Sequence, residues 1–195
     1  MTKPVGLLTL QGDYEKHRQI FDSLGVETIG VRRPIELDLV SALVIPGGES
    51  TTLTRLMDRV ELRKPLLDFA VNNPVMGTCA GLIMMSASLA EEKFNDYGVA
   101  PLGMLDCKVL RNGYGRQIDS FSAPVRIDAL DGSAEEFAAV FIRAPRIVEV
   151  GPKAEVVAAF EGEPVAVRQG HLLGLTFHPE LTADVRIHRA FLSMI

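Results

Sequence analysis

The chain has 195 residues, 47% of them hydrophobic and 23% charged, so residues 1–195 are expected to form one globular domain with a substantial core. Its formal net charge of -5 and the lack of any long basic run exclude a footprint for nucleic acid or an anionic membrane, and favour small molecules or proteins as partners. With only two cysteines, no signal-peptide pattern and no run of about 18 apolar residues, we expect a cytoplasmic protein without a disulfide framework.

The first half of the chain alternates short apolar runs with amphipathic runs. Strands are predicted at residues 5–10, 26–31, 42–45 and 74–78, and helices at residues 14–24, 51–59 and 62–72. Gly25 is the expected stop of the first helix. Buried strands that alternate with helices form a parallel sheet covered on both faces, and ligands of such sheets bind at the carboxyl ends of the strands.

A cysteine stands at the end of the fourth predicted strand. Residues 77–81 have the sequence Gly-Thr-Cys-Ala-Gly and are followed by a predicted helix at residues 82–89. A strand that turns sharply into a helix strains the backbone at its apex, and a glycine two positions to either side of Cys79 tolerates that turn. The amino end of the helix would favour the nucleophilic thiolate. A small buried core cysteine is the alternative interpretation of this segment.

The second half of the chain has strands separated by turns, and it is expected to be largely antiparallel. Strands are predicted at residues 104–110, 121–127, 139–142, 156–160, 164–168 and 172–177. A closing helix is predicted at residues 183–194, with Thr182 as its N-cap. Because no repeat or linker separates the two halves, a single α/β domain with a mixed sheet is the simplest arrangement.

His178 and Glu180 follow the last predicted strand, in the sequence Phe-His-Pro-Glu at residues 177–180. Side chains two positions apart in an extended chain lie on the same side, so the carboxylate can hold one imidazole nitrogen while the other faces a thiol. Together with Cys79 these residues have the types and order of a nucleophile, a base and an orienting group. A turn histidine beside a solvated glutamate is the alternative.

The segment Gly47-Gly48-Glu49-Ser50 follows the third predicted strand. Two glycines leave backbone N–H groups open to an oxyanion or to the main-chain end of a small substrate. A phosphate loop is disfavoured because the Walker A spacing is absent, whereas an ordinary helix-opening turn stays open as an alternative.

Two arginines lie beside predicted bends. Arg111 precedes Asn-Gly-Tyr-Gly-Arg-Gln, and Arg143 stands in Ile-Arg-Ala-Pro at residues 142–145. A guanidinium group suits a carboxylate or a phosphate, although a solvated loop arginine is the commoner case. Cys107 and His171 have no ligand spacing with the other candidates, so no metal site is predicted and both are interpreted as structural.

These segments together resemble the class I (triad) glutamine amidotransferases, and within them the glutaminase subunits of pyridoxal 5'-phosphate synthase. The resemblance extends over nearly the whole chain. The Cys79 and His178 motifs are typical of the superfamily, and Gly-Gly-Glu-Ser, Arg-Asn and Ile-Arg-Ala-Pro narrow it to the subfamily. The matching segments are 10–12, 46–52, 77–82, 111–112, 115–117, 141–145 and 177–181.

The resemblance implies a three-layer, flavodoxin-like α/β fold with a mixed, mostly parallel central sheet and added antiparallel strands. It also implies that Cys79 attacks the side-chain amide of L-glutamine, that His178 transfers the protons and that Glu180 orients His178. A γ-glutamyl thioester on Cys79 is then hydrolysed, and no cofactor takes part. The N–H groups of Ala80 and Gly48 would form the oxyanion hole.

The resemblance further implies a glutamine site and a partner. The ammonia would pass to a separate (β/α)₈-barrel synthase subunit in a hetero-oligomeric complex, and residues 10–12 with the helix after them are candidates for the contact surface. The chain has Lys16-His17 where Glu-His is expected, and the segment 91–101 is longer than usual. The implied glutamine-binding residues are Gly47, Gly48, Glu49, Ser50, Arg111, Ile142 and Arg143.

Four other interpretations compete with this one. A glutaminase subunit of another amidotransferase, such as imidazole glycerol phosphate synthase, is disfavoured by the distal motifs. A cysteine variant of the α/β-hydrolases is disfavoured by the chain order and by the closely spaced His-Pro-Glu. A non-catalytic regulatory module is disfavoured because Cys79, His178 and Glu180 are all present. Metal binding ranks lowest.

Overall fold

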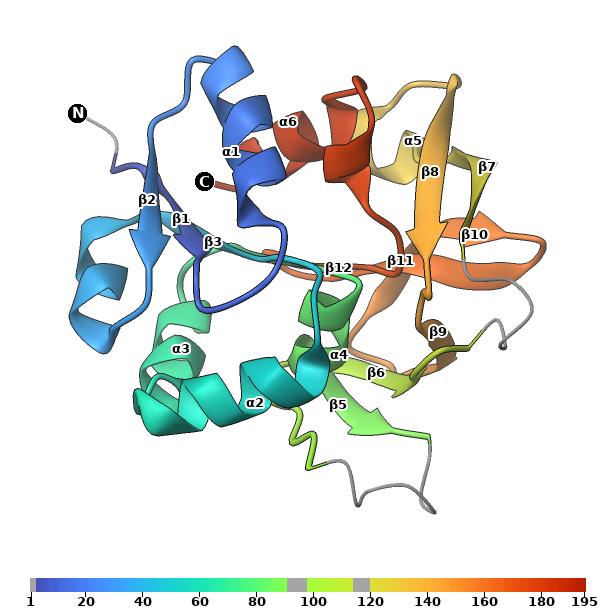
Figure 1. The fold of residues 1–195 in the computed structure, drawn as a ribbon. Coiled ribbons are helices and arrows are strands. Elements are labelled where there is room, and N and C mark those ends of the chain that lie inside the picture. The colour runs from blue at the N-terminus through green and yellow to red at the C-terminus, as the bar shows by residue number, and fades with distance from the viewer. Residues whose placement is uncertain (1–2, 91–97, 114–119) are drawn as a thin grey trace.

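The computed structural model describes residues 3–90, 98–113 and 120–195 (Figure 1). In these residues the central sheet has seven strands in the order β10-β11-β12-β4-β3-β1-β2. The strands from β12 to β2 are parallel to one another, whereas β11 runs antiparallel to both of its neighbours, β10 and β12. The strands are β1 (Val5–Leu8), β2 (Thr28–Val31), β3 (Ala42–Ile45), β4 (Val75–Thr78), β10 (Glu155–Phe160), β11 (Glu163–Gln169) and β12 (Leu172–Leu175).

The inner strands are buried on both faces, which is why they are continuous apolar runs in the sequence. In β3 all four residues are buried. Leu43 belongs to the core on one face of the sheet, and Val44 to the core on the other. Because side chains of β3 pack into both cores, the strand is held in position, and so is the start of the loop at residues 46–49 that follows it.

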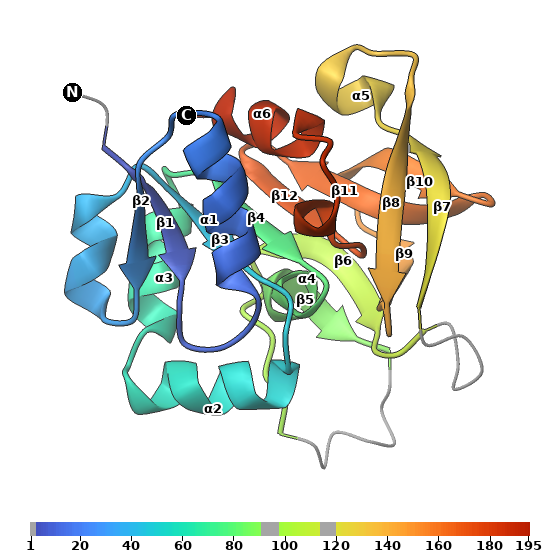
Figure 2. The same cartoon turned by 45° about the horizontal axis from the view of Figure 1, so that its top comes forward.

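Helices cover the two faces and complete three layers, as Figures 1 and 2 show. One face carries α1 (Tyr14–Ser23) and α6 (Arg186–Leu192), and the other carries α2 (Ser50–Arg59), α3 (Arg63–Ala70) and α4 (Ala80–Met85). The predicted fold class is therefore confirmed. Across the part of the chain that the structure describes, none of the helices combines the length and the apolar character needed to cross a bilayer.

Further strands lie outside the central sheet. A three-stranded sheet has the order β5-β6-β9 and packs on the side of α4. A two-stranded antiparallel pair, β7-β8, packs on the side of α6, and Phe137 and Phe141 from β8 enter that core. The additional elements are β5 (Ser86–Leu89), β6 (Leu105–Leu110), β7 (Ser120–Arg126), α5 (Asp128–Asp131), β8 (Glu136–Ile142), β9 (Arg146–Val150) and the 3₁₀ turns η1 (Pro34–Leu39) and η3 (Pro179–Leu181).

Two predictions about the elements after Cys79 are wrong. The predicted helix at residues 82–89 ends at Met85, because Ser86 turns into β5 and pairs with β6 at Leu105. The strand β9 was not predicted, although its Arg-Ile-Val-Glu-Val pattern is rich in β-branched residues. Its partner is β6, and that pairing supplies the hydrogen bonds that a short isolated strand lacks.

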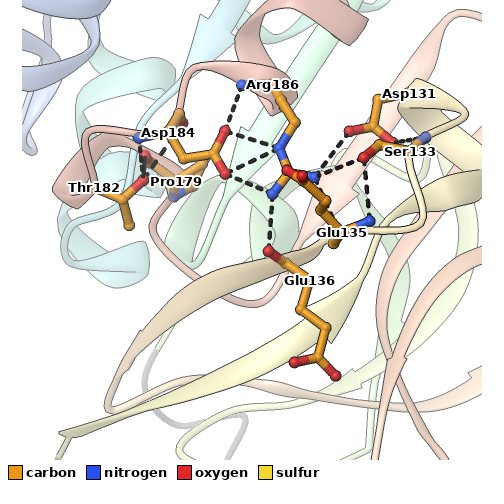
Figure 3. A network of polar contacts seen from close by, with 8 residues as sticks. All are labelled: Asp131, Ser133, Glu135, Glu136, Pro179, Thr182, Asp184 and Arg186. Atoms are coloured by element: carbon orange, nitrogen blue, oxygen red, sulfur yellow. Dashed lines mark hydrogen bonds and ion pairs between the residues drawn. The ribbon is translucent and has the colours of Figure 1, made fainter.

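The start of the last helix also differs from the prediction. Thr182 follows the turn η3, and the helix α6 begins only at Arg186. Val185 therefore occupies the N-cap position instead of Thr182, and the carboxylate of Asp184, one residue earlier, accepts the backbone N–H of Arg186 at 3.0 Å. The Arg186 guanidinium then donates to Asp184, to Asp131 and to the carbonyl oxygens of Glu135 and Glu136, which ties α6 to the segment that enters β8 (Figure 3).

Candidate active site

Cys79 stands at the junction of β4 and α4, as predicted, and has a strained backbone. Its φ is 50° and its ψ is -105°, in a region that residues with a Cβ rarely occupy. The Cys79 N–H donates to the carbonyl of Leu175 in β12 at 2.8 Å, which holds the strained residue against the neighbouring strand. Its sulfur lies 3.9 Å from the Ile142 carbonyl oxygen. The side chain is therefore placed at the carboxyl edge of the sheet.

The two glycines that flank Cys79 are required by close packing. A Cβ at Gly81 would overlap the carbonyl oxygen of Ile45 in β3, and a Cβ at Gly77 would lie 2.8 Å from the carbonyl oxygen of Gly81. The strand β4 and the helix α4 therefore approach more closely than any other residue type allows. The sequence prediction of a tight strand-to-helix turn is confirmed, with steric contact as its main reason.

His178 follows β12 and is held by its neighbours on two sides. Its backbone N–H donates to the carbonyl of Val140 in β8 at 2.8 Å, and its ring packs against Gly47, where a Cβ would overlap it. Burial by itself would lower the pKa of His178, but hydrogen bonds to Cys79 and Glu180, with the charges of both groups, raise the pKa to about 10. At neutral pH the imidazole is therefore protonated.

Glu180 lies behind His178, and its side chain is fully buried. Its Oε1 accepts a hydrogen bond from His178 Nδ1 at 2.6 Å. The two residues do not converge along an extended chain, as the sequence analysis assumed. His178 instead caps the 3₁₀ turn η3, and the turn carries Glu180 back toward the ring. Burial opposes ionisation of Glu180, but His17 and His178 outweigh it and lower the pKa of the carboxyl group.

The Gly47-Gly48 loop between β3 and α2 is fixed by the segment after β1. The Gln11 side-chain oxygen accepts the N–H of Glu49 at 2.9 Å, and the N–H of Asp13 donates to the Gly47 carbonyl at 3.2 Å. A Cβ at Gly48 would lie 2.5 Å from the Gln11 side chain. Gln11, which the sequence analysis placed only at a partner surface, thus shapes the loop that was predicted to meet an oxyanion.

These segments surround one cavity of about 640 Å³. All the residues predicted to bind glutamine line it, together with Cys79 and His178, whereas Glu180 lies behind the wall. Ala80, the first residue of α4, follows Cys79 directly. The motif residues 115–117 and residues 91–97 of the long segment lie outside the described residues. The lining residues are Gln11, Gly12, Asp13, Gly47, Gly48, Glu49, Ser50, Cys79, Ile83, Arg111, Asn112, Ile142, Arg143 and His178.

Backbone strain is concentrated at this cavity. Five non-glycine residues in the described part of the chain have a positive φ, and three of them, Cys79, Asn112 and Arg143, line the cavity. Arg143 lies 3.9 Å from the carboxylate of Glu49, and both side chains are more than half exposed. The cavity therefore presents a cation and an anion at its mouth and the thiol within it, an arrangement that fits a small amino acid.

Neither remaining candidate has the surroundings of a reactive site. Burial, with the nearby charge of Asp106, raises the pKa of the Cys107 thiol to about 12. His171 Nε2 contacts the Ala70 carbonyl oxygen at 2.9 Å, on the opposite edge of the sheet. No group of three or more His, Cys, Asp or Glu residues that could hold a metal ion occurs in residues 3–90, 98–113 and 120–195.

Comparison with known proteins gives a consistent result over the full chain. The family described as "SNO glutamine amidotransferase family" matches residues 7–195. A protein of Thermotoga sp. (strain RQ2), named pyridoxal 5'-phosphate synthase subunit PdxT, is 44% identical over 193 residues, which cover 98% of both chains. A protein of the same name from Mycobacteroides abscessus is 44% identical over 196 residues, which cover 100% of this chain and 98% of that one.

Solved structures agree with the fold. One described as a glutamine amidotransferase superimposes with a TM-score of 0.89 at 38% identity, and the match covers 97% of both chains. The structure of PurLQS from Thermotoga maritima superimposes with a TM-score of 0.69 at 14% identity and covers 98% of this chain and 99% of that one, which supports the fold alone.

Proposed function

The chain belongs to the SNO glutamine amidotransferase family, and on that premise we propose that it is the glutaminase subunit of a pyridoxal 5'-phosphate synthase. It hydrolyses L-glutamine to L-glutamate and ammonia. We take residues 1–195 as one glutaminase domain, and we assign it to the cytoplasm, a reducing compartment that suits a free nucleophilic thiol. The carrying observation is that Cys79, the His178–Glu180 pair and the Gly47-Gly48 loop meet at one cavity.

Glutamine binds with its side-chain amide at Cys79 and its main-chain end at the mouth of the cavity. Arg111 and Arg143 face the α-carboxylate, and the Glu49 carboxylate faces the α-ammonium group. Gly47, Gly48, Ser50 and Ile142 complete the walls. Because charges of both signs stand at the mouth, the site selects a zwitterionic amino acid over a simple amide.

The reaction begins when the thiol proton of Cys79 passes to His178, and the resulting thiolate is the nucleophile. The sulfur attacks the amide carbon, and the N–H groups of Ala80 and Gly48 stabilise the oxyanion. His178 then donates its proton to the amide nitrogen as the carbon–nitrogen bond breaks. Ammonia leaves, and a γ-glutamyl thioester joins the substrate to Cys79.

Hydrolysis of the thioester restores the enzyme. The now neutral His178 takes a proton from water, and the resulting hydroxide attacks the thioester carbon. The carbon–sulfur bond breaks, glutamate leaves, and His178 and Cys79 return as imidazolium and thiolate. Glu180 holds Nδ1 of His178 throughout, so that Nε2 faces the reacting atoms.

The ammonia passes to a partner rather than to water. We assign that partner as a (β/α)₈-barrel synthase subunit in a hetero-oligomeric complex, in line with the similarity to subunits of pyridoxal 5'-phosphate synthase. The segment at residues 10–12 with α1 is the proposed contact. This position fits control of activity by the partner, since Gln11 also holds the Glu49 N–H in the oxyanion loop.

The test compares the wild-type chain with Cys79→Ala in a glutamate-release assay, alone and with purified candidate barrel subunits. Wild-type turnover that rises with one barrel, glutamine-dependent formation of pyridoxal 5'-phosphate, and loss of at least about 10⁴-fold in Cys79→Ala are expected. Circular dichroism checks that the variant is folded. Full activity of Cys79→Ala would exclude the mechanism, and stimulation only by the barrel of imidazole glycerol phosphate synthase would move the protein to that pathway. Inactive wild type with every barrel would favour a regulatory module.

A further inference from the structure

Two buried histidines that the proposed reaction does not use lie behind the site. His17 in α1 and His188 in α6 are both 0% exposed. His17 Nδ1 and His188 Nε2 are 3.0 Å apart, although the two residues are 171 positions apart in the chain. On its other side, His17 Nε2 lies 3.4 Å from Glu180 Oε2 and 3.5 Å from the Thr78 hydroxyl. The pair thus extends the line from Cys79 through His178 and Glu180.

The second carboxylate oxygen of Glu180, Oε2, lies between His178 and the histidine pair and lacks a hydrogen-bond donor among the described residues. Oε1 is bonded to His178, but Oε2 is fully buried and makes no hydrogen bond to any residue that the structure describes. Its contact with His17 is electrostatic in this geometry and is short of a full hydrogen bond. A buried carboxylate oxygen without a partner is costly, so an N–H donor facing it is strongly favoured.

The tautomers of the two histidines follow from their contacts. If His188 Nε2–H donates to His17 Nδ1, then His17 carries its proton on Nε2, facing Glu180, and His188 Nδ1 is a bare acceptor. The opposite assignment would aim a lone pair of His17 at the carboxylate and would leave an N–H of His188 buried without a partner. His188 Nδ1 makes no hydrogen bond in the described part of the chain, and an unpaired acceptor there costs less than an unpaired donor.

Both imidazoles are neutral at physiological pH. Burial lowers the pKa of His17, and the charge of His178 adds to it, against the opposing effects of Glu180 and Asp13. Burial and the neighbouring His17 lower the pKa of His188 to about 3. The rings of Phe21 and His188 pack edge to face, with their centroids 5.2 Å apart, so an aromatic side chain lies against the histidine pair. His17 therefore acts as a hydrogen-bond donor and adds no charge.

We propose that His17 is a positioning residue of this site: its Nε2–H holds the second carboxylate oxygen of Glu180, and His188 fixes the tautomer that makes this possible. The inference rests on the proposed glutaminase function. With Oε1 held by His178 and Oε2 by His17, the carboxylate plane is fixed, and with it the ring of His178. The titratable groups around His17 are Glu180 from η3, His188 from α6, His178 after β12 and Asp13 before α1.

The kinetic test uses two substitutions of His17. His17→Gln keeps an N–H near the position of Nε2, whereas His17→Leu fills the space without a donor. We expect His17→Leu to lower kcat roughly 10- to 100-fold, the factor of one hydrogen bond to a charged group, with KM for glutamine nearly unchanged. His17→Gln should recover much of that loss. His171→Gln, remote from the site, is the control and should match the wild type.

The pH profile separates positioning from simple packing. Without His17, burial of Glu180 is opposed only by His178 and by a backbone hydrogen bond. The Glu180 pKa should therefore rise, and the acidic limb of the kcat profile should move to higher pH. Equal losses in His17→Gln and His17→Leu would overturn the proposal. So would a folded His17→Leu protein with wild-type turnover and an unmoved acidic limb.

A second measurement covers the case in which His17→Leu does not fold. In the wild-type chain labelled with ¹⁵N-histidine, NMR should show His17 as the neutral Nε2–H tautomer at physiological pH. The Nδ1–H tautomer, or a charged His17, would overturn the proposal. Because this readout needs no turnover, it stays valid if the wild-type chain releases no glutamate, a result that would contradict the proposed function instead.

Discussion

The parallel half of the chain, through β4, and the mostly antiparallel half after it build the site in different ways. The parallel half places Cys79 and the Gly47-Gly48 loop at the ends of adjacent strands, where any parallel sheet gathers its loops. The second half places His178, Ile142 and Arg143 through pairings between distant segments. The nucleophile thus depends on local turn geometry, whereas the base depends on the correct docking of β12 and β8.

The halves meet where β4 pairs with β12, and there the Cys79 N–H donates to the Leu175 carbonyl at 2.8 Å. Within the second half, the His178 N–H donates to the Val140 carbonyl of β8, also at 2.8 Å. Each half therefore positions a reacting residue by holding it against a strand of the second half. The predictions below break this arrangement from one side or the other, in order of decreasing effect on turnover.

The largest effect is expected from the second half. His178→Asn removes the group that carries the proton, and we expect glutamate release to fall about 10⁴-fold or more with the fold preserved. Steady-state kinetics beside circular dichroism measures both. A folded variant that retains a tenth of the wild-type activity would show that another group transfers the proton.

A smaller loss is expected from a first-half substitution that displaces the second-half base. In Gly47→Ala the added Cβ would overlap the His178 ring, so the ring must move away from Cys79. We expect kcat to fall roughly 100-fold, since shifts of about 1 Å in a reacting group have effects of that size. The matched control is Gly25→Ala, where a Cβ meets nothing within 4 Å, although its φ of +71° costs stability. Equal turnover in both variants would contradict the contact.

The electrostatic link between the halves can be measured without turnover. Because Cys79 helps to raise the pKa of His178 to about 10, Cys79→Ala should lower that pKa. NMR titration of His178 in both proteins checks the direction. The sign for stability follows: what protonated His178 contributes to folding is fully present below its unfolded pKa of about 6.5 and is lost as the pH rises through about 10. An unchanged titration in Cys79→Ala would show that the two groups are uncoupled.

The smallest effect on turnover is expected at Arg186, which ties segments of the second half together and does not line the cavity (Figure 3). Arg186→Met removes the guanidinium that donates to Asp131, Asp184 and two carbonyl groups, so we expect a loss of about 1–3 kcal/mol in the free energy of unfolding. Denaturant unfolding measures this loss. The half-buried Arg168, paired with the exposed Glu155, is the control, and Arg168→Met should cost less than about 1 kcal/mol.

The same variant should also change how the stability of the protein depends on pH in the acidic range. Burial would raise the pKa of Asp184, but the hydrogen bonds and charge of Arg186 lower it. The stability that this pair contributes is present above the unfolded pKa near 4 and is lost as the pH falls through the lowered folded value. In Arg186→Met this part of the acid sensitivity should disappear. Identical acid unfolding curves for the two proteins would contradict the assignment.

The sequence determined the parallel half almost completely. The strand at residues 42–45 and the turn around Cys79 depend on apolar runs, glycines and helix periodicity within about ten positions, and such patterns survive in any context. Local patterns also identified His178 and Glu180, and the family resemblance indicated many of the residues that line the cavity. They failed where pairing with a distant strand decides the conformation, as in β5 and β9.

Only the tertiary structure decided how these segments meet. It placed His17 against Glu180 and His188, pressed Gly47 against His178 and used Gln11 to hold the loop. The helix pattern of α1 marks His17 as a buried position, in line with Ile20 and Phe21, but not what it faces. The physical reason is that a buried hydrogen bond between residues 171 positions apart depends on the packing of three layers, and no local stretch of sequence carries that information.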